Sequence, residues 1–152
     1  MLGITHVLFA AVFAFLLVNI FSFSHPVHFF LLFCFSALLP DIDHTRSILG
    51  KKIWPLSCVI SFFFGHRGLL HSIFVPVIFL GLGYYFDVFW IGLAIAGGYC
   101  THLMGDAFTF SGVRPFWFGL KIKGIIRTGG LLEMLFFFLL FLLFAGLFFR
   151  TL

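Results

Sequence analysis

Five long apolar runs, separated by short polar stretches, dominate this chain of 152 residues and leave few folds open to it. A membrane-spanning helix needs about 20 predominantly apolar residues, and lipid offers no partner to an unsatisfied backbone group, so such runs are expected to be helical. We therefore predict five transmembrane helices, at Ile4 to Phe23, His28 to Leu39, Leu69 to Phe86, Val88 to Phe108 and Leu131 to Phe149.

Composition supports the same class. The chain is 62% hydrophobic and 9% charged, with a mean hydropathy of +1.22, whereas soluble domains are about half apolar. No basic region precedes the first run, so we expect that run to be a retained helix and not a cleaved leader. We see no internal repeat or linker, and we expect residues 1–152 to form a single all-α integral membrane domain.

Two further segments fall outside the five spans. The apolar run Ile53 to Phe64 would extend only ~18 Å as a helix, against a hydrocarbon core of roughly 30 Å, and we interpret it as re-entrant or interfacial. Val113 to Arg127 is rich in aromatic and β-branched residues, with Lys121 and Lys123 in alternation, which predicts a small hairpin or an interfacial lid.

The few histidines and acidic residues gather at the ends of the apolar runs. Ionisable groups are costly in apolar surroundings, and mixed sets of imidazoles and carboxylates are typical ligands of divalent metals. We therefore predict a metal site, with two or more divalent ions, zinc first among them, as cofactors. The predicted metal ligands are His6, Asp41, Asp43, His66, His71, His102 and Asp106.

Each cluster taken alone also has an ordinary structural explanation. His102 and Asp106 are four residues apart on a predicted helix, where they could hold one ion or simply bond to each other. Asp41 and Asp43 could bridge two cations or solvate a helix end, and His71 could cap the next helix. The shared site is favoured because several separate segments bring such residues to one face.

Topology provides a second argument. Threading the five spans through a bilayer places every cluster on one side, together with eight of the nine basic residues, and leaves only Arg150 opposite. An excess of basic residues marks the cytoplasmic side. We therefore expect the N-terminus and the metal site on the cytoplasmic side of the inner or plasma membrane. Orientation also accounts for the formal charge of +4, so we expect no nucleic acid partner.

Four ordered motifs carry a family resemblance. They read Leu39-Pro40-Asp41-Ile42-Asp43-His44, then Ser47-x-Leu49-Gly50, then Gly65-His66-Arg67-Gly68-x-x-His71-Ser72, then Gly98-Tyr99-x-x-His102-x-x-x-Asp106-x-x-Thr109-x-x-Gly112-Val113.

This succession resembles the YdjM-like family of LexA-regulated inner-membrane proteins, and the likeness extends from His6 to Gly130 and Glu133. The resemblance implies a metal-dependent hydrolase, distantly similar in its His/Asp pattern to zinc phospholipase C and nuclease P1. Leu70 and Phe110 depart from the family pattern, in which threonine and proline are common at these positions. Neither departure removes a predicted ligand.

The functional hypothesis is a membrane-bound hydrolase that cleaves a phosphate ester of a lipid or lipid-linked substrate with a metal-activated water. Arg67 would neutralise the substrate phosphate, and Glu133 or His44 would orient a ligand or move a proton. The rival is a non-catalytic protein that binds metal or carries it across the bilayer, although a transporter needs access from both faces. The sequence leaves the substrate, the metal and the oligomeric state open.

Overall fold

The computed structural model describes residues 1–45, 47–64, 69–116 and 119–151, and these residues form helices and no β-strand. The all-α prediction is therefore confirmed for the described chain. The helical elements are α1 (Gly3–Ile20), α2 (Pro26–Ser36), η1 (Pro40–Asp43), α3 (Ile48–Lys52), α4 (Trp54–Phe64), η2 (Leu69–His71), α5 (Phe74–Tyr85), α6 (Phe89–Ala107) and α7 (Leu131–Thr151).

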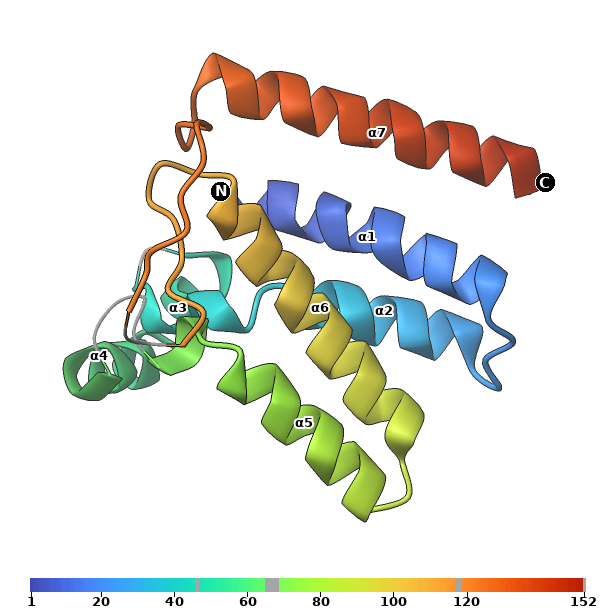
Figure 1. The fold of residues 1–152 in the computed structure, drawn as a ribbon, viewed down its shortest axis with the longest axis horizontal. Helices are drawn as coiled ribbons and strands as arrows, with labels where there is room; N and C mark the ends of the chain where they lie inside the picture. The colour runs from blue at the N-terminus through green and yellow to red at the C-terminus, as the bar shows by residue number, and fades with distance from the viewer. Residues whose placement is uncertain (46, 65–68, 117–118, 152) are drawn as a thin grey trace.

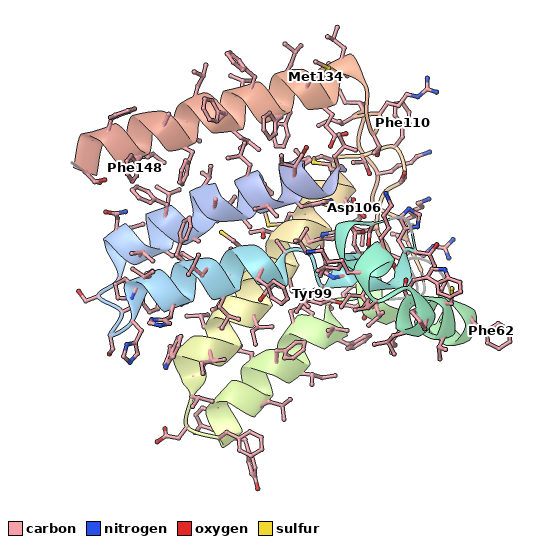
Figure 2. The ribbon with its side chains drawn as sticks, turned by 180° about the vertical axis from the view of Figure 1, so that it is seen from behind. Phe62, Tyr99, Asp106, Phe110, Met134 and Phe148 are labelled. Carbon is pink, nitrogen blue, oxygen red and sulfur yellow. The ribbon has the colours of Figure 1, made fainter. Side chains whose placement is uncertain are left out.

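Helix α6 is the centre of the arrangement: it packs against α1 and α2 on one side and α5 on the other (Figure 1). Helix α7 lies on the outside of this group and packs mainly against α1, where Phe9, Val12 and Leu140 form a buried cluster (Figure 2). The starts of α1 and α7 and the ends of α2 and α6 lie toward one end of the molecule, beside α3 and α4 (Figure 1).

Glycines allow the close packing of α6. A Cβ added to Gly98 would lie 2.0 Å from the carbonyl oxygen of Phe33 on α2, and one added to Gly92 would lie 2.9 Å from the Cα of Gly83 on α5. Only a residue without a side chain permits either approach, and small residues serve the same purpose between helices in membranes. The three helices are thus held backbone to backbone.

Helix α6 also runs between the two ends of the α1–α2 hairpin. Near its start, the ring of Trp90 lies 5.5 Å from that of His25, in the turn between α1 and α2. Near its end, the ring of His102 stacks on that of His6, at the start of α1. The 19 residues of α6 correspond to a rise of about 28 Å.

All five predicted spans are helical, but length and apolarity single out three of them. Within the described residues, the stretches long and apolar enough to cross a membrane are Gly3–Ile20, Pro26–Asp43 and Leu131–Thr151. Helix α5 has only 12 residues, and α6 carries polar residues in its last two turns. The apolar run Ile53 to Phe64 forms the short helix α4, which contacts η1.

Residues 109–116 and 119–127, here called the return loop, reverse the chain between α6 and α7. Val113 and Ile122 exchange backbone hydrogen bonds of 2.8 and 2.9 Å in an antiparallel bridge. Gly112 turns the chain at a φ of 64°, and a Cβ there would lie 2.4 Å from the Ile122 carbonyl oxygen. In the described residues, the small hairpin predicted over Val113 to Arg127 is limited to isolated bridges and has no continuous strands, and the interfacial lid stays a prediction.

Candidate metal centre

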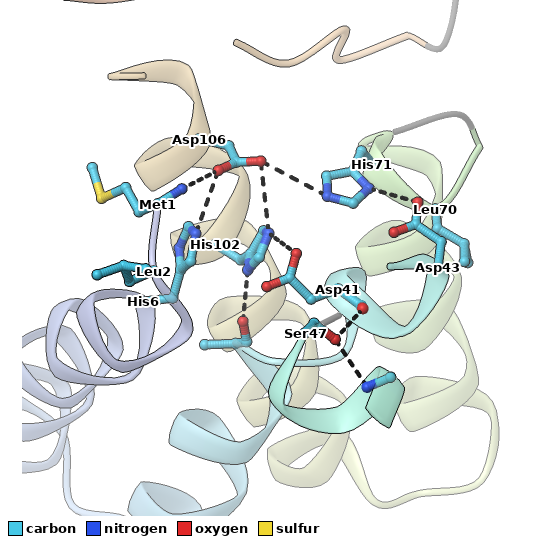
Figure 3. Close-up of polar contacts among 12 residues, drawn as sticks. Met1, Leu2, His6, Asp41, Asp43, Ser47, Leu70, His71, His102 and Asp106 are labelled. Carbon is cyan, nitrogen blue, oxygen red and sulfur yellow. Dashed lines mark hydrogen bonds and ion pairs between the residues drawn. The ribbon is translucent and has the colours of Figure 1, made fainter. Parts of the chain in front are cut away.

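Polar side chains from four helix ends meet at one buried position (Figure 3). They come from the first turns of α1, from η1 after α2, from η2 before α5 and from the last turns of α6. Two of the predicted site residues, His66 and Arg67, lie outside the described residues. The six predicted ligands that the structure describes and brings together are His6, Asp41, Asp43, His71, His102 and Asp106.

His102 lies in the middle of this cluster and is fully buried. Its Nδ1 is 2.7 Å from the carbonyl oxygen of Ala37, the residue at the end of α2. A carbonyl only accepts, so Nδ1 carries the proton and Nε2 presents a lone pair. Nε2 makes no hydrogen bond in the described chain and lies 3.8 Å from Asp41 Oδ1 and 3.9 Å from Asp106 Oδ2.

His6 lies face to face with His102, with ring centroids 3.8 Å apart and an angle of 15° between the planes. Its Nε2 is 3.4 Å from Asp106 Oδ1, an oxygen that also accepts a 2.8 Å hydrogen bond from the α-amino group of Met1. On α6, a Cβ at Gly105 would lie 2.9 Å from His6 Nδ1. The imidazole of His6 therefore fits against α6 only because Gly105 has no side chain.

His71 is held between two carboxylates. Its Nδ1 is 3.4 Å from Asp43 Oδ2, and its Nε2 is 3.8 Å from Asp106 Oδ2 (Figure 3). All three side chains are buried. Asp43 thus stands behind His71, on the side away from Asp106, in the arrangement by which second carboxylates orient metal-binding histidines.

The ligand atoms fall into two groups that share His102. One is His6, His102 and Asp106, and the other is Asp41, His71 and His102; within each, all ligand atoms lie within 4.8 Å of one another. Asp106 belongs to the first group and also directs Oδ2 toward His71. The set of imidazoles and carboxylates, with the buried Nε2 of His102 left without a hydrogen bond, fits a divalent cation.

The two remaining described candidates lie outside these groups. Glu133 is buried in the first turn of α7, where Oε1 accepts a 2.6 Å hydrogen bond from the Leu2 amide and Oε2 one of 2.7 Å from the Gly129 amide. Its carboxylate therefore holds the start of α1 in place. His44 ends η1 and is half-buried. A proton-transfer role for either residue stays a prediction.

Supporting residues that the sequence reasoning did not name also shape the centre. The hydroxyl of Tyr99 donates to the carbonyl of Leu70, which ties η2 to α6. The hydroxyl of Ser47 donates to the Asp41 carbonyl at 2.7 Å and accepts from the Gly50 amide at 2.9 Å. Tyr99 and Ser47 both belong to the motifs quoted above, and only their place in those motifs could have indicated from the sequence that they support the centre.

Comparison with known proteins places the chain in a family. The profile described as YdjM inner membrane protein matches residues 1–152. The chain is 35% identical over 103 residues to YvsG of Bacillus subtilis (strain 168), which is described as uncharacterized, covering 65% of this chain and 64% of that protein.

It is also 38% identical over 89 residues to the inner membrane protein YdjM of Escherichia coli (strain K12) and, equally, to that of Shigella flexneri, covering 54% of this chain and 45% of each relative. The matched regions thus span between about half and two thirds of these relatives. No solved structure matches the chain. The match over every residue and the likeness to these inner membrane proteins show that the chain belongs to the YdjM inner membrane protein family.

Proposed function

We propose that the buried cluster holds two divalent cations, zinc first among them, and that the protein hydrolyses a phosphate ester of a lipid or lipid-linked substrate. The observation that carries the proposal is the lone pair of His102 Nε2, buried without a hydrogen bond and facing two carboxylates. A buried acceptor left in this way is costly unless something binds it. A cation is the partner that suits both the imidazole and the carboxylates.

His6, His102 and Asp106 would hold one cation, and Asp41 and His71 would hold the other. His102 belongs to both groups of ligand atoms, and Asp106 Oδ2 also lies 3.8 Å from His71 Nε2. When bound, such cations polarise a phosphoryl oxygen and supply a water that ionises near neutral pH. The chain supplies the rest: Ala37 fixes the tautomer of His102, and Asp43 fixes the ring of His71.

The place of the cluster favours a substrate drawn from the membrane. It lies at the ends of helices that are apolar along most of their length, and Asp41 is only half-buried, so the cluster is not fully closed off at this residue. A phosphate at the headgroup level would meet the cluster there while its lipid chain stays in the bilayer. A soluble metabolite gains nothing from that position.

We also propose that the chain crosses the membrane five times, with the cluster on the cytoplasmic side. The contacts of α6 support five crossings. The start of α6 contacts the turn at His25, and its end contacts His6 at the start of α1, so α6 extends alongside α1 and would cross a membrane that α1 crosses. Helix α5 is bound to α6 at Gly83 and Gly92. The basic residues at the cluster end support the orientation.

The test is metal content followed by turnover. We expect protein purified in detergent to contain stoichiometric zinc or another divalent ion, the His102→Ala variant to lose it, and the His28→Ala variant to keep it, because His28 is exposed at the far end. Wild type that binds no metal after reconstitution would refute the site.

Activity is then measured as release of phosphate or a phosphorylated headgroup from phospholipids. Loss of turnover in Asp41→Ala supports the hydrolase, whereas bound metal with no turnover on any phosphate ester overturns it and leaves the non-catalytic alternative. Metal uptake into liposomes by the wild type, absent in His102→Ala, would favour transport instead.

A further inference from the structure

The return loop has an unusual charge for so apolar a chain. It contains four of the nine basic residues and no acidic residue: the four are Arg114, Lys121, Lys123 and Arg127. All four side chains are exposed. A surface segment with one sign of charge has an opposite partner or is solvated by water alone.

Exposed apolar side chains are interspersed with these bases. Leu120 is 90% exposed and Ile125 is 73% exposed, and Phe110 and Phe116 are exposed as well. Water alone is a poor environment for such large apolar side chains placed together. The boundary between headgroups and hydrocarbon accommodates both kinds, since basic side chains reach the phosphates while apolar ones enter the acyl layer.

The loop is fixed at the level where that boundary is expected. It follows α6 and precedes α7, at the end of the molecule where α1 and α7, two of the apolar helices long enough to span a membrane, both begin (Figure 1). The amide of Ile73, before α5, donates a 2.8 Å hydrogen bond to the Pro115 carbonyl. Val113 is buried against the helices. The loop is thus docked on the bundle and presents its bases outward.

From these observations we propose that the return loop is a binding surface for anionic phospholipid headgroups, with Arg114, Lys121, Lys123 and Arg127 contacting phosphates and with Leu120 and Ile125 in the acyl layer. The occupant follows from charge complementarity: four exposed cations without an acid in the loop match a negatively charged leaflet, and the exposed apolar residues require lipid chains. This surface goes beyond the hydrolase proposal and stands whether or not the cluster turns over a substrate.

The experiment measures lipid selectivity and does not use activity. Full-length protein is reconstituted into vesicles of phosphatidylcholine containing spin-labelled phosphatidylglycerol or spin-labelled phosphatidylcholine, and the motionally restricted fraction of each label is compared. We expect the wild type to prefer phosphatidylglycerol by several-fold, and the preference to weaken as salt rises, because exposed charges are screened.

Two double variants that lose the same charge distinguish lipid binding by the return loop from a general attraction of anionic lipid to basic residues elsewhere. Lys121→Gln with Lys123→Gln should remove most of the preference, whereas Lys51→Gln with Lys52→Gln, two exposed lysines at the end of α3, should retain it. Equal restriction of the two labels by the wild type would overturn the proposal, as would equal loss in both double variants.

Hydrogen exchange of the wild type provides a second readout that needs no variant. Amides of residues 119–127 in the wild type should exchange more slowly in nanodiscs that contain phosphatidylglycerol than in nanodiscs of phosphatidylcholine alone. Equal exchange rates in the two lipids would contradict the surface, whatever the metal content or turnover of the protein.

Discussion

At the scale of single residues, the candidate centre depends on groups that are not ligands. The carbonyl of Ala37 lies past the last turn of α2, where helix carbonyls have no partner within the helix, and it is therefore available to His102 Nδ1. Asp43 plays a similar part for His71. The orientation of each imidazole is thus set by the end of a neighbouring element.

Asp43→Asn tests the orienting role. The substitution keeps the shape but removes the charge behind His71, and changes of this kind typically weaken metal affinity by about 10- to 100-fold. Competition with a chelator, monitored as zinc retained per chain, measures the change. Asp87→Asn, at the far end between α5 and α6, is the matched control and should bind as the wild type does. A larger loss, equal to that of His102→Ala, would mean that Asp43 is itself a ligand.

Gly105→Ala tests the space left for His6. The new methyl group would lie 2.9 Å from His6 Nδ1, too close for the present ring position, so the imidazole must shift away from Asp106. We expect reduced metal occupancy with helix content unchanged by circular dichroism. Gly146→Ala on α7, where a Cβ meets nothing within 4 Å, should have no effect. Full occupancy in Gly105→Ala would show that His6 does not bind metal.

At the scale of elements, the start of α1 is held by α7. The first amides of a helix have no acceptor within the helix, and the amide of Leu2 at the start of α1 is one of them. It donates to the carboxylate of Glu133, which lies in the first turn of α7 and also accepts from the Gly129 amide. The same short turn of α1 carries His6. Docking of the last helix therefore fixes the position of one predicted ligand near the beginning of the chain.

Glu133→Gln separates this role from proton transfer. A glutamine side chain has one oxygen where the glutamate has two, so one of the two part-buried hydrogen bonds to the Leu2 and Gly129 amides is lost, at a cost of about 1 kcal/mol. We expect a lower thermal unfolding temperature in detergent and a partial loss of bound metal. Unchanged stability combined with lost hydrolysis would instead indicate that Glu133 moves a proton.

Helix positions were largely predictable from the sequence, because apolar runs such as Ile4 to Phe23 correspond closely to α1. The convergence of the clusters followed from threading the runs through a bilayer. The separate positions of Asp41 and Asp43 did not, since the two are only two residues apart in η1 and only the fold shows that Asp41 faces His102 and Asp43 faces His71. A carbonyl such as that of Ala37 has no sequence signal at all.

At the scale of the whole molecule, the two ends differ in chemistry. The cluster end has most of the basic residues and the buried histidines, whereas the opposite end has the turn between α1 and α2 and the turn between α5 and α6. His25 and Trp90 bring these two turns together. In the proposed topology, a bilayer that contains α1 also contains α6, and the short helix α5 with it.

Cysteine accessibility tests that inference. In a background lacking Cys34, Cys58 and Cys100, Tyr85→Cys places a thiol at a position that is 79% exposed beside the far turn. Lys51→Cys places one at the cluster end. With five crossings and a cytoplasmic cluster, a membrane-impermeant maleimide should label Tyr85→Cys only in right-side-out vesicles and Lys51→Cys only in inverted ones.

The other labelling patterns are equally informative. Labelling of both cysteines from one side would mean that α5 and α6 do not cross, which would leave the three helical stretches singled out by length and apolarity. Opposite labelling with the sides exchanged would keep five crossings and overturn the cytoplasmic cluster. We expect neither, because alternating spans would bring four helix ends to one cluster, and the excess of basic residues beside that cluster favours the cytoplasmic face.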